Sequence, residues 1–166
     1  MNVKILHVDD DEKQLMFTKL ILEESNPSIT VTSINFPNEV IKELEKDSYD
    51  CVISDYNMPR LDGLQLAKKI REKTDIPILL YTGQGSEEIA EQAFSSGVDC
   101  YVRKEANQAN YHILTQSIQN LVEKHRAQTQ LTESEQRYKR LVEESPLPIS
   151  VTTGDLIVYV NQKGQN

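Results

Sequence analysis

The stretch that decides the fold is VKILHVDDD, residues 3–11. Its first six residues are mostly aliphatic or β-branched, and a short apolar run of this kind is typical of a buried β-strand. Three consecutive aspartates follow at once. The stretch therefore predicts a buried strand with acidic side chains at its carboxyl end.

The alternation of short apolar runs and helical patterns continues to about residue 106. The runs that predict strands are 3–8, 29–34, 51–54, 76–81 and 100–102. Apolar residues at helical spacing lie between them, in 15–22, 40–44, 64–70 and 89–94. Strands separated by helices are typical of βαβ units, so we predict an α/β fold with a doubly wound, five-stranded parallel sheet. In such a sheet the site lies beyond the carboxyl ends of the strands.

Polar side chains gather where these strands end. Asp9 and Asp10 follow the first strand, Asp55 the third, Thr82 the fourth and Lys104 the fifth. Because parallel strands end at one edge of the sheet, we expect these side chains to converge. Three carboxylates in one pocket raise each other's pKa unless a cation joins them, and Mg²⁺ with retained waters fits best. A carboxylate nucleophile, a metal ion, a lysine and a hydroxyl form a phosphoryl-transfer set.

The net charge of −8 lies in the first part of the chain. Residues 1–106 hold 20 acidic and 12 basic residues, whereas residues 107–166 hold 6 of each. This argues against nucleic-acid binding, and no run of about 18 apolar residues predicts a membrane span. The N-terminus does not resemble a signal peptide, so we expect a cytoplasmic protein with no membrane contact. Cys51, Cys100 and His7 lie in apolar runs, and we expect all three to be core residues, the cysteines reduced.

The chain changes character after residue 106. Residues 107–144 contain no glycine or proline and are rich in good helix formers, which predicts one long helix. Its apolar residues follow the spacing of a coiled-coil seam, which weakens at 125–128 and resumes out of phase. The seam residues are Tyr111, Leu114, Ile118 and Leu121, then Leu131, Tyr138, Leu141 and Val142. Residues 149–160 read as a β-hairpin around a Gly-Asp turn.

Residues 1–106 resemble the receiver domain of two-component response regulators, which has a flavodoxin-like fold. Five motifs in the family's order and spacing carry the resemblance: ILHVDDD at 5–11, SDYNMP at 54–59, LDGL at 61–64, YTG at 81–83 and YVRK at 101–104. The resemblance implies a phosphoacceptor module of a phosphorelay, with a histidine kinase or phosphotransfer protein as partner. It also implies that the module is not an enzyme beyond its own phosphorylation and slow dephosphorylation.

The resemblance assigns roles to the acids and the lysine. It implies that Asp55 is the phosphoacceptor and takes the phosphoryl group. It implies a Mg²⁺ site made by Asp9, Asp10, Asp55 and the carbonyl of Asn57. Lys104 is implied to pair with the phosphoryl group.

A second set of residues is implied to report phosphorylation. Thr82 would move to hydrogen-bond the phosphoryl group, and Tyr101 would be the coupled aromatic switch. The alternative for Tyr101 is a packed aromatic side chain without a switching role. Tyr56 and Gln84 are implied only to tune the lifetime of the phosphoryl group.

One position departs from the family pattern. The family usually has proline after this lysine, often with a cis peptide bond, whereas Glu105 follows Lys104 here. A cis bond before a residue other than proline costs about 3 kcal/mol, so we predict a trans bond. We expect a locally remodelled loop in which Lys104 still reaches toward Asp55.

The tail has a resemblance of its own. Residues 135–161 resemble the start of a PAS domain and would cover only about its first quarter. We therefore divide the chain into a receiver core at 1–106, a coiled-coil-like helix or linker at 107–145 and an incomplete PAS-like segment at 146–166. We expect a piece of a longer protein, in which the helix links the receiver to a PAS sensor.

The length of the helix bears on the oligomeric state. A helix over 107–144 would extend about 57 Å, whereas a receiver of this size is only about 26 Å wide. Its far half cannot pack on its own domain, so we expect a homodimer through the C-terminal helix. The alternative is a monomer whose helix breaks near 125–128 and folds back.

Other functions remain open at this point. A Mg²⁺-dependent phosphatase with an aspartyl nucleophile would need a second acid two residues after Asp55, where Asn57 stands. A structural pseudo-receiver would have lost an acid or the lysine, and none is lost. A DNA-binding regulator has no support, because no basic patch follows the receiver. The sequence names neither the cognate kinase, the input signal nor the downstream output, and it does not say whether phosphorylation favours the dimer.

Overall fold

The computed structural model describes residues 2–83, 87–105, 107–161 and 163. The chain forms two compact units, residues 1–125 and residues 126–166. Among the described residues, no helix has the length and apolar character needed to cross a membrane.

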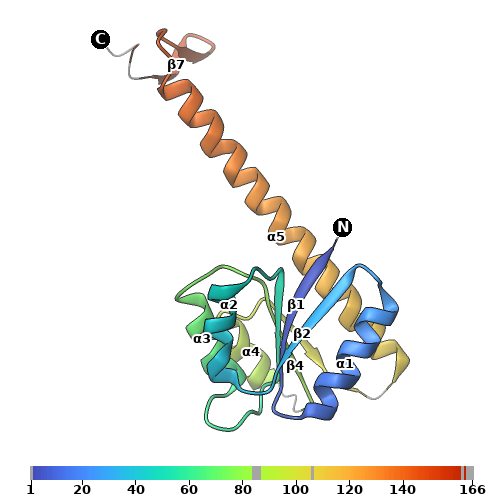
Figure 1. Cartoon of the computed structure of the whole chain (residues 1–166). Helices are drawn as coiled ribbons and strands as arrows, with labels where there is room; N and C mark the ends of the chain where they lie inside the picture. Colours follow the sequence, from blue (N-terminus) through green and yellow to red (C-terminus); the bar gives the residue numbers. More distant parts are fainter. Residues whose placement is uncertain (1, 84–86, 106, 162, 164–166) are drawn as a thin grey trace. The chain divides into compact units, whose positions relative to one another are not determined.

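The first unit alternates strands and helices along the chain (Figure 1). Its elements are β1 (Val3–Val8), α1 (Glu12–Ser25), β2 (Ile29–Ile34), the 3-10 helix η1 (Pro37–Glu39), α2 (Val40–Lys46), β3 (Cys51–Ser54), α3 (Gly63–Arg71), β4 (Ile78–Thr82), α4 (Glu87–Ser95) and β5 (Cys100–Arg103). Helix α5 (Gln108–Glu143) begins in this unit and ends in the second, which also holds β6 (Ser150–Thr153) and β7 (Leu156–Val160).

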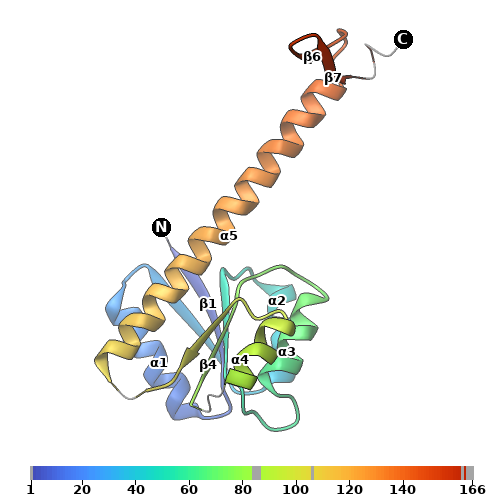
Figure 2. The same ribbon diagram turned by 180° about the vertical axis from the view of Figure 1, so that it is seen from behind.

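The five strands of the first unit form one parallel sheet in the order β2-β1-β3-β4-β5. This order confirms the predicted doubly wound fold, in which the chain reverses direction across the sheet between β1 and β3. Helices α2, α3 and α4 cover one face, and α1 and α5 cover the other (Figures 1 and 2). The carboxyl ends of β1 and β3 therefore meet at the switch point, where such folds place their sites.

Alternating side chains build a core on each face of the sheet. Leu6 and Val8 of β1 pack with residues of α3 and α4, whereas Val3 and Ile5 pack with residues of α1 and α5. Three apolar residues of α5, Leu114, Ile118 and Val122, are almost fully buried in the second cluster. The first turns of α5 are thus part of the core of the first unit.

Small differences from the predicted boundaries have physical causes. Strand β4 begins at Ile78 rather than at position 76, because Pro77 has no N–H to donate to the ladder. Pro37, expected between elements, is the first residue of η1, where its fixed φ suits a helical start. No peptide bond among the described residues is cis, so the predicted trans bond between Lys104 and Glu105 is confirmed. Cys51 and Cys100 form no disulfide, as expected.

The second unit joins the end of α5 to the predicted hairpin, β6–β7, which is antiparallel. Gly154 in its turn has φ +62°, a conformation that glycine adopts without strain. The fully buried side chain of Asn161 ties the hairpin to the helix: its amide nitrogen donates to the carbonyls of Val142 and Leu147, both at 3.0 Å, and its oxygen accepts from the N–H of Ile149 at 2.9 Å. Helix α5 is continuous through 125–128, so the break considered above is not observed.

Candidate functional site

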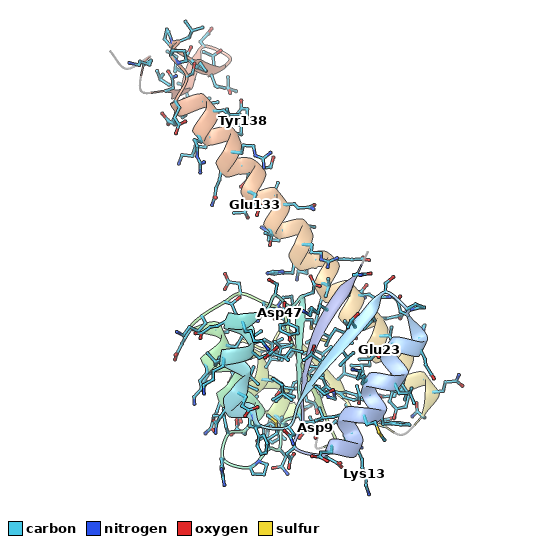
Figure 3. All side chains as sticks on the ribbon, viewed as in Figure 1. Asp9, Lys13, Glu23, Asp47, Glu133 and Tyr138 are labelled. Atoms are coloured by element: carbon cyan, nitrogen blue, oxygen red, sulfur yellow. The ribbon has the colours of Figure 1, made fainter. Side chains whose placement is uncertain are left out.

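The site lies at the carboxyl edge of the sheet, as predicted. Asp9 follows β1, Asp55 follows β3 and Lys104 follows β5. Figure 3 shows Asp9 at this end of the sheet and Asp47 at the opposite end. The alternation of each strand places Asp9, Asp55 and Lys104 on the face that α1 and α5 cover, so the three side chains can meet.

One cation joins the two buried acids. The Nζ atom of Lys104 lies 2.6 Å from Oδ2 of Asp9 and 2.8 Å from Oδ1 of Asp55. Asp9 is 2% exposed and Asp55 is 7% exposed. Lys104 thus reaches Asp55, as expected, and holds both carboxylates in place before any ligand arrives.

Backbone N–H groups fix the remaining carboxylate oxygens. Oδ1 of Asp9 accepts from the N–H of Asp11 at 2.9 Å, and Oδ2 of Asp55 accepts from the N–H of Asn57 at 2.7 Å. Each oxygen of the two acids therefore accepts one of these hydrogen bonds, and a carboxylate oxygen has a second lone pair. The site is preorganised, yet it retains capacity to bind a cation or to attack a phosphorus atom.

Burial and charge shift the pKa values of the site in opposing ways. Burial raises the pKa of Asp9, although its hydrogen bond to Lys104 acts in the opposite direction. Burial by itself would lower the pKa of the Lys104 ammonium, but the hydrogen bonds to Asp55 and Asp9 outweigh it and raise that pKa above its usual value. Lys104 is therefore charged at neutral pH. Burial makes the ionised form of Asp9 less favourable in the folded chain than in water.

A shallow cavity of about 260 Å³ opens above these groups. It is lined by Asp9, Asp10, Asp11, Gln14, Asp55, Asn57, Thr82, Gly83 and Lys104. Every residue of the predicted catalytic and metal sets lies on this wall. Asp10 and Asn57 are exposed residues.

The donors present fit a hard divalent cation. With Asp9, Asp10, Asp11 and Asp55 ionised and Lys104 protonated, the wall carries three negative charges in excess. The available donors are carboxylate and carbonyl oxygens, which Mg²⁺ prefers together with water. Among the described residues, no three acidic, imidazole or thiol side chains converge on one point. The metal set stated above consists of three carboxylates, Asp9, Asp10 and Asp55, and one backbone carbonyl; the three acids line one cavity, but their side chains do not meet at a single point.

The two predicted switch residues lie on the opposite face of the sheet. Thr82 is the last residue of β4 and is buried, and its carbonyl accepts from the N–H of Lys104 at 2.8 Å. Tyr101 of β5 is half-buried against the core beneath α3 and α4, and it pairs in register with Leu80. Tyr56 also packs there. Gln84, which the resemblance linked to the phosphoryl lifetime, lies outside the residues that the structure describes.

His7 lies in β1 on the same face as Asp9, and it is fully buried. Neither of its ring nitrogens has a hydrogen-bond partner among the described residues. Burial, helped by the charge of Lys104, lowers the pKa of His7 to about 3. His7 is thus a neutral core residue, as expected.

Two residues at the site, Tyr81 and Asn110, were given no role by the sequence patterns, although Tyr81 lies in the YTG motif. The hydroxyl of Tyr81 donates to Oδ1 of Asn110 at 3.2 Å, and the Lys104 ammonium lies 5.6 Å from the centre of the Tyr81 ring. Burial raises the pKa of Tyr81. The available signal was a tyrosine directly before Thr82 in an apolar strand, because a buried tyrosine hydroxyl needs a partner.

Comparison with known proteins agrees with this geometry. The family model described as the response regulator receiver domain matches residues 5–119. The transcriptional regulatory protein SrrA of Staphylococcus aureus is 32% identical over 104 residues, which are 63% of this chain and 42% of that protein. The chain thus matches less than half the length of this curated relative.

Solved structures show the same fold. A response regulator receiver domain protein from Clostridium thermocellum aligns with a TM-score of 0.67 and 26% identity, covering 75% of this chain and 98% of that one. The receiver domain of the Francisella response regulator 1452 aligns with a TM-score of 0.67 and 29% identity, covering 75% and 99%.

Proposed function

The chain belongs to the response regulator receiver domain family, and we propose that Asp55 is its phosphoacceptor. The donor would be the phosphohistidine of a histidine kinase or of a phosphotransfer protein. The observation that carries the proposal is the shared contact of Lys104 with Asp9 and Asp55 at the switch point of the sheet. A lysine that joins two buried acids beside an open cavity is poised for the charge of a phosphoryl group.

The proposed transfer takes place at Asp55. A carboxylate oxygen of Asp55 forms a bond to phosphorus while the bond from phosphorus to the donor nitrogen breaks, and the electron pair leaves with the imidazole. The product is an acyl phosphate. Lys104 then donates to a phosphoryl oxygen in place of the carboxylate, and the N–H of Asn57 keeps the other Asp55 oxygen in position. A bound Mg²⁺ would neutralise charge on the transferred oxygens.

Asp9, Asp10, Asp55 and the carbonyl of Asn57 are the proposed metal ligands. Their support is the excess of three negative charges and the oxygen donors on one wall of the cavity. Burial raises the pKa of Asp9 and so disfavours its ionised form. A divalent cation would offset this cost, which makes metal binding and ionisation of Asp9 mutually favourable.

The proposed output begins with Thr82 and Tyr101. Thr82 lines the cavity and is joined through its carbonyl to the backbone of Lys104. Tyr101 lies in β5, three residues before Lys104. The proposed targets of the signal are α5 and a PAS sensor that residues 135–161 would begin.

A homodimer through α5 is the proposed oligomeric state. Leu131, Tyr138 and Leu141 are 54%, 68% and 68% exposed, and Figure 3 shows Tyr138 on this helix. Their spacing of seven and three residues is that of a coiled-coil seam. Leaving a large apolar side chain in water forgoes about 1.5–3 kcal/mol, so a second copy that covers these residues is favoured.

Labelling with a small phosphodonor tests the phosphoacceptor proposal. The full chain is incubated with acetyl phosphate and Mg²⁺, and its intact mass is recorded. We expect the mass of one phosphoryl group to be added, and we expect chelation of Mg²⁺ to suppress the addition. Equal labelling of the Asp55→Asn variant would contradict the proposal.

A further inference from the structure

We propose that Asn110, in the first turn of α5, is a positioning residue that holds Lys104 in reach of Asp55, and that Tyr81 assists it. We call Asn110 and Tyr81 together the clamp. The inference rests on the proposed function, because it concerns the lysine that would receive the phosphoryl charge. It adds two residues to which the sequence analysis assigned no role, although Tyr81 lies within the YTG motif. It also gives the first turn of α5 a direct link to the site.

Asn110 grips the backbone on both sides of Lys104. Its Nδ2 donates to the carbonyl of Arg103 at 2.7 Å, and its Oδ1 accepts from the N–H of Glu105 at 3.3 Å. The N–H of Lys104 itself donates to the carbonyl of Thr82 at 2.8 Å. The peptide groups that flank the lysine are thus held by α5, whereas its own N–H is held by β4.

The hydrogen bonds fix the orientation of the Asn110 amide. A flipped amide would set its NH₂ against the N–H of Glu105 and its oxygen against the carbonyl of Arg103, and both contacts would be repulsive. The backbone N–H of Asn110 donates to Oδ1 of Asn107 at 2.8 Å, which anchors the residue at the start of the helix. Asn110 is 6% exposed, so water competes little for these bonds.

Tyr81 contacts both Asn110 and the side chain of Lys104. Its hydroxyl donates to Oδ1 of Asn110 at 3.2 Å, while its ring lies beneath the Lys104 ammonium at 5.6 Å. Tyr81 is 2% exposed and lies on the same sheet face as Asp9 and Asp55. The buried ring of Tyr81 therefore lies next to the Lys104 ammonium. Asn110 hydrogen-bonds both to Tyr81 and to the backbone on either side of Lys104.

This arrangement does more than cap a helix. A residue that only capped α5 would bond to the backbone of its own first turn, which is what Asn107 does. The side chain of Asn110 instead bonds to the backbone of residues 103 and 105, which flank Lys104, and to Tyr81 of β4. Loss of its bonds would free the backbone at 103–105, and a displacement of about 1 Å is enough to slow a positioned reaction substantially.

The test uses the full chain with three variants and two matched controls. The variants are Asn110→Ala, the isosteric Asn110→Asp and Tyr81→Phe. Thr115→Val removes a buried hydroxyl one turn further along α5, where it bonds to the carbonyl of Tyr111. Tyr49→Phe removes a partly buried tyrosine hydroxyl that bonds to Glu43, away from the site.

Two readouts are taken on folded protein. The first is the rate constant of labelling by acetyl phosphate with Mg²⁺. The second is the NMR titration of the Lys104 ammonium, with hydrogen exchange of the Glu105 amide, both in metal-free protein. Neither of the metal-free readouts needs phosphorylation.

We expect Asn110→Ala to label about tenfold more slowly and Tyr81→Phe about threefold more slowly, with unchanged controls. The Lys104 pKa should fall and the Glu105 amide should exchange faster. Asn110→Asp should also label more slowly than the parent chain, because a carboxylate cannot donate to the carbonyl of Arg103. If Asn110→Asp labelled at the rate of the parent chain, Asn110 would only fill space, and the inference would be overturned.

Failure of the clamp and failure of the proposed function give different results. Variants that label at the rate of the parent chain, with an unchanged Lys104 titration, would overturn the clamp alone. A parent chain that takes no label would overturn the proposed function, while the metal-free readouts would still decide the clamp. Should Asn110→Ala fail to fold, Tyr81→Phe removes a single hydroxyl and carries the same test.

Discussion

Asp9 and Asp55 share one cation: the ammonium of Lys104 lies 2.6 Å from the first carboxylate and 2.8 Å from the second. The three residues directly follow β1, β3 and β5, so only the assembled sheet brings them together. The contact balances one of the two buried negative charges and leaves the other for a ligand. We therefore expect a bound cation to stabilise the site.

Replacement of Asp9 should separate stability from function. Its raised pKa means that the native chain binds the proton of Asp9 more tightly than the unfolded chain does. The ionised group thus destabilises the native state at neutral pH, and this penalty disappears as the pH falls below the folded pKa. We expect Asp9→Asn to raise the thermal midpoint, and to slow labelling by acetyl phosphate at least about tenfold.

Asp10→Asn is the matched control for this stability effect, because Asp10 is exposed and loses little hydration on folding. Its thermal midpoint should stay within about 1 °C of the parent chain. A lower midpoint for Asp9→Asn would mean that the ion pair with Lys104 outweighs the cost of burial.

His7 should make the fold sensitive to acid. Its pKa is about 3 in the native state and 6.5 in the unfolded chain, so the unfolded chain binds the extra proton between these values. Stability falls as the pH drops from 6.5 toward 3, by up to about 1.4 kcal/mol per pH unit. The free energy of unfolding, measured with urea at a series of pH values, should depend less steeply on pH for His7→Phe than for the parent chain. His112→Phe, which replaces an exposed histidine, should keep the parent slope.

Gly63 should tolerate no side chain. A Cβ atom there would overlap the backbone oxygen of Asp55 and lie 2.8 Å from Cδ1 of Leu80. We expect Gly63→Ala to cost about 1–3 kcal/mol of stability in urea unfolding, and to slow labelling because Asp55 must shift. At Gly83 an added Cβ meets nothing within 4 Å, so Gly83→Ala should leave the unfolding midpoint unchanged.

The edge of the sheet could be predicted from sequence, and the clamp could not. Asp9, Asp55, Thr82 and Lys104 each end an apolar run, so alternation alone places them at one edge. Asn110 gains its role only because α5 packs on the sheet through Leu114 and Ile118. That packing angle depends on the whole core, and no local pattern encodes it.

The tail shows the same limit. Its helix and hairpin follow from the absence of glycine and proline and from the Gly-Asp turn. The role of Asn161 does not, because its partners Val142, Leu147 and Ile149 become neighbours only when the hairpin folds against the helix end. A single polar residue after a strand carries no signal of what it will hold.

The exposed seam of α5 should hold a dimer. Light scattering at tens of micromolar should give twice the mass of one chain, and Leu131→Glu with Leu141→Glu should give the mass of one chain, because charges would face each other across the seam. Gln130→Glu with Gln136→Glu adds the same charge elsewhere on the helix and should leave the dimer intact. A parent chain that is monomeric under these conditions would contradict the proposed seam.

Phosphorylation at Asp55 is the central claim, and localisation of the label tests it most directly. After incubation with acetyl phosphate and Mg²⁺, borohydride reduces an aspartyl phosphate to homoserine, which peptide mass spectrometry then locates. We expect homoserine at position 55 and at no other aspartate, with Asp9, Asp10 and Asp62 unmodified in the same digest. Homoserine at another position, or its absence from 55 in a chain that has gained a phosphoryl group, would contradict the account.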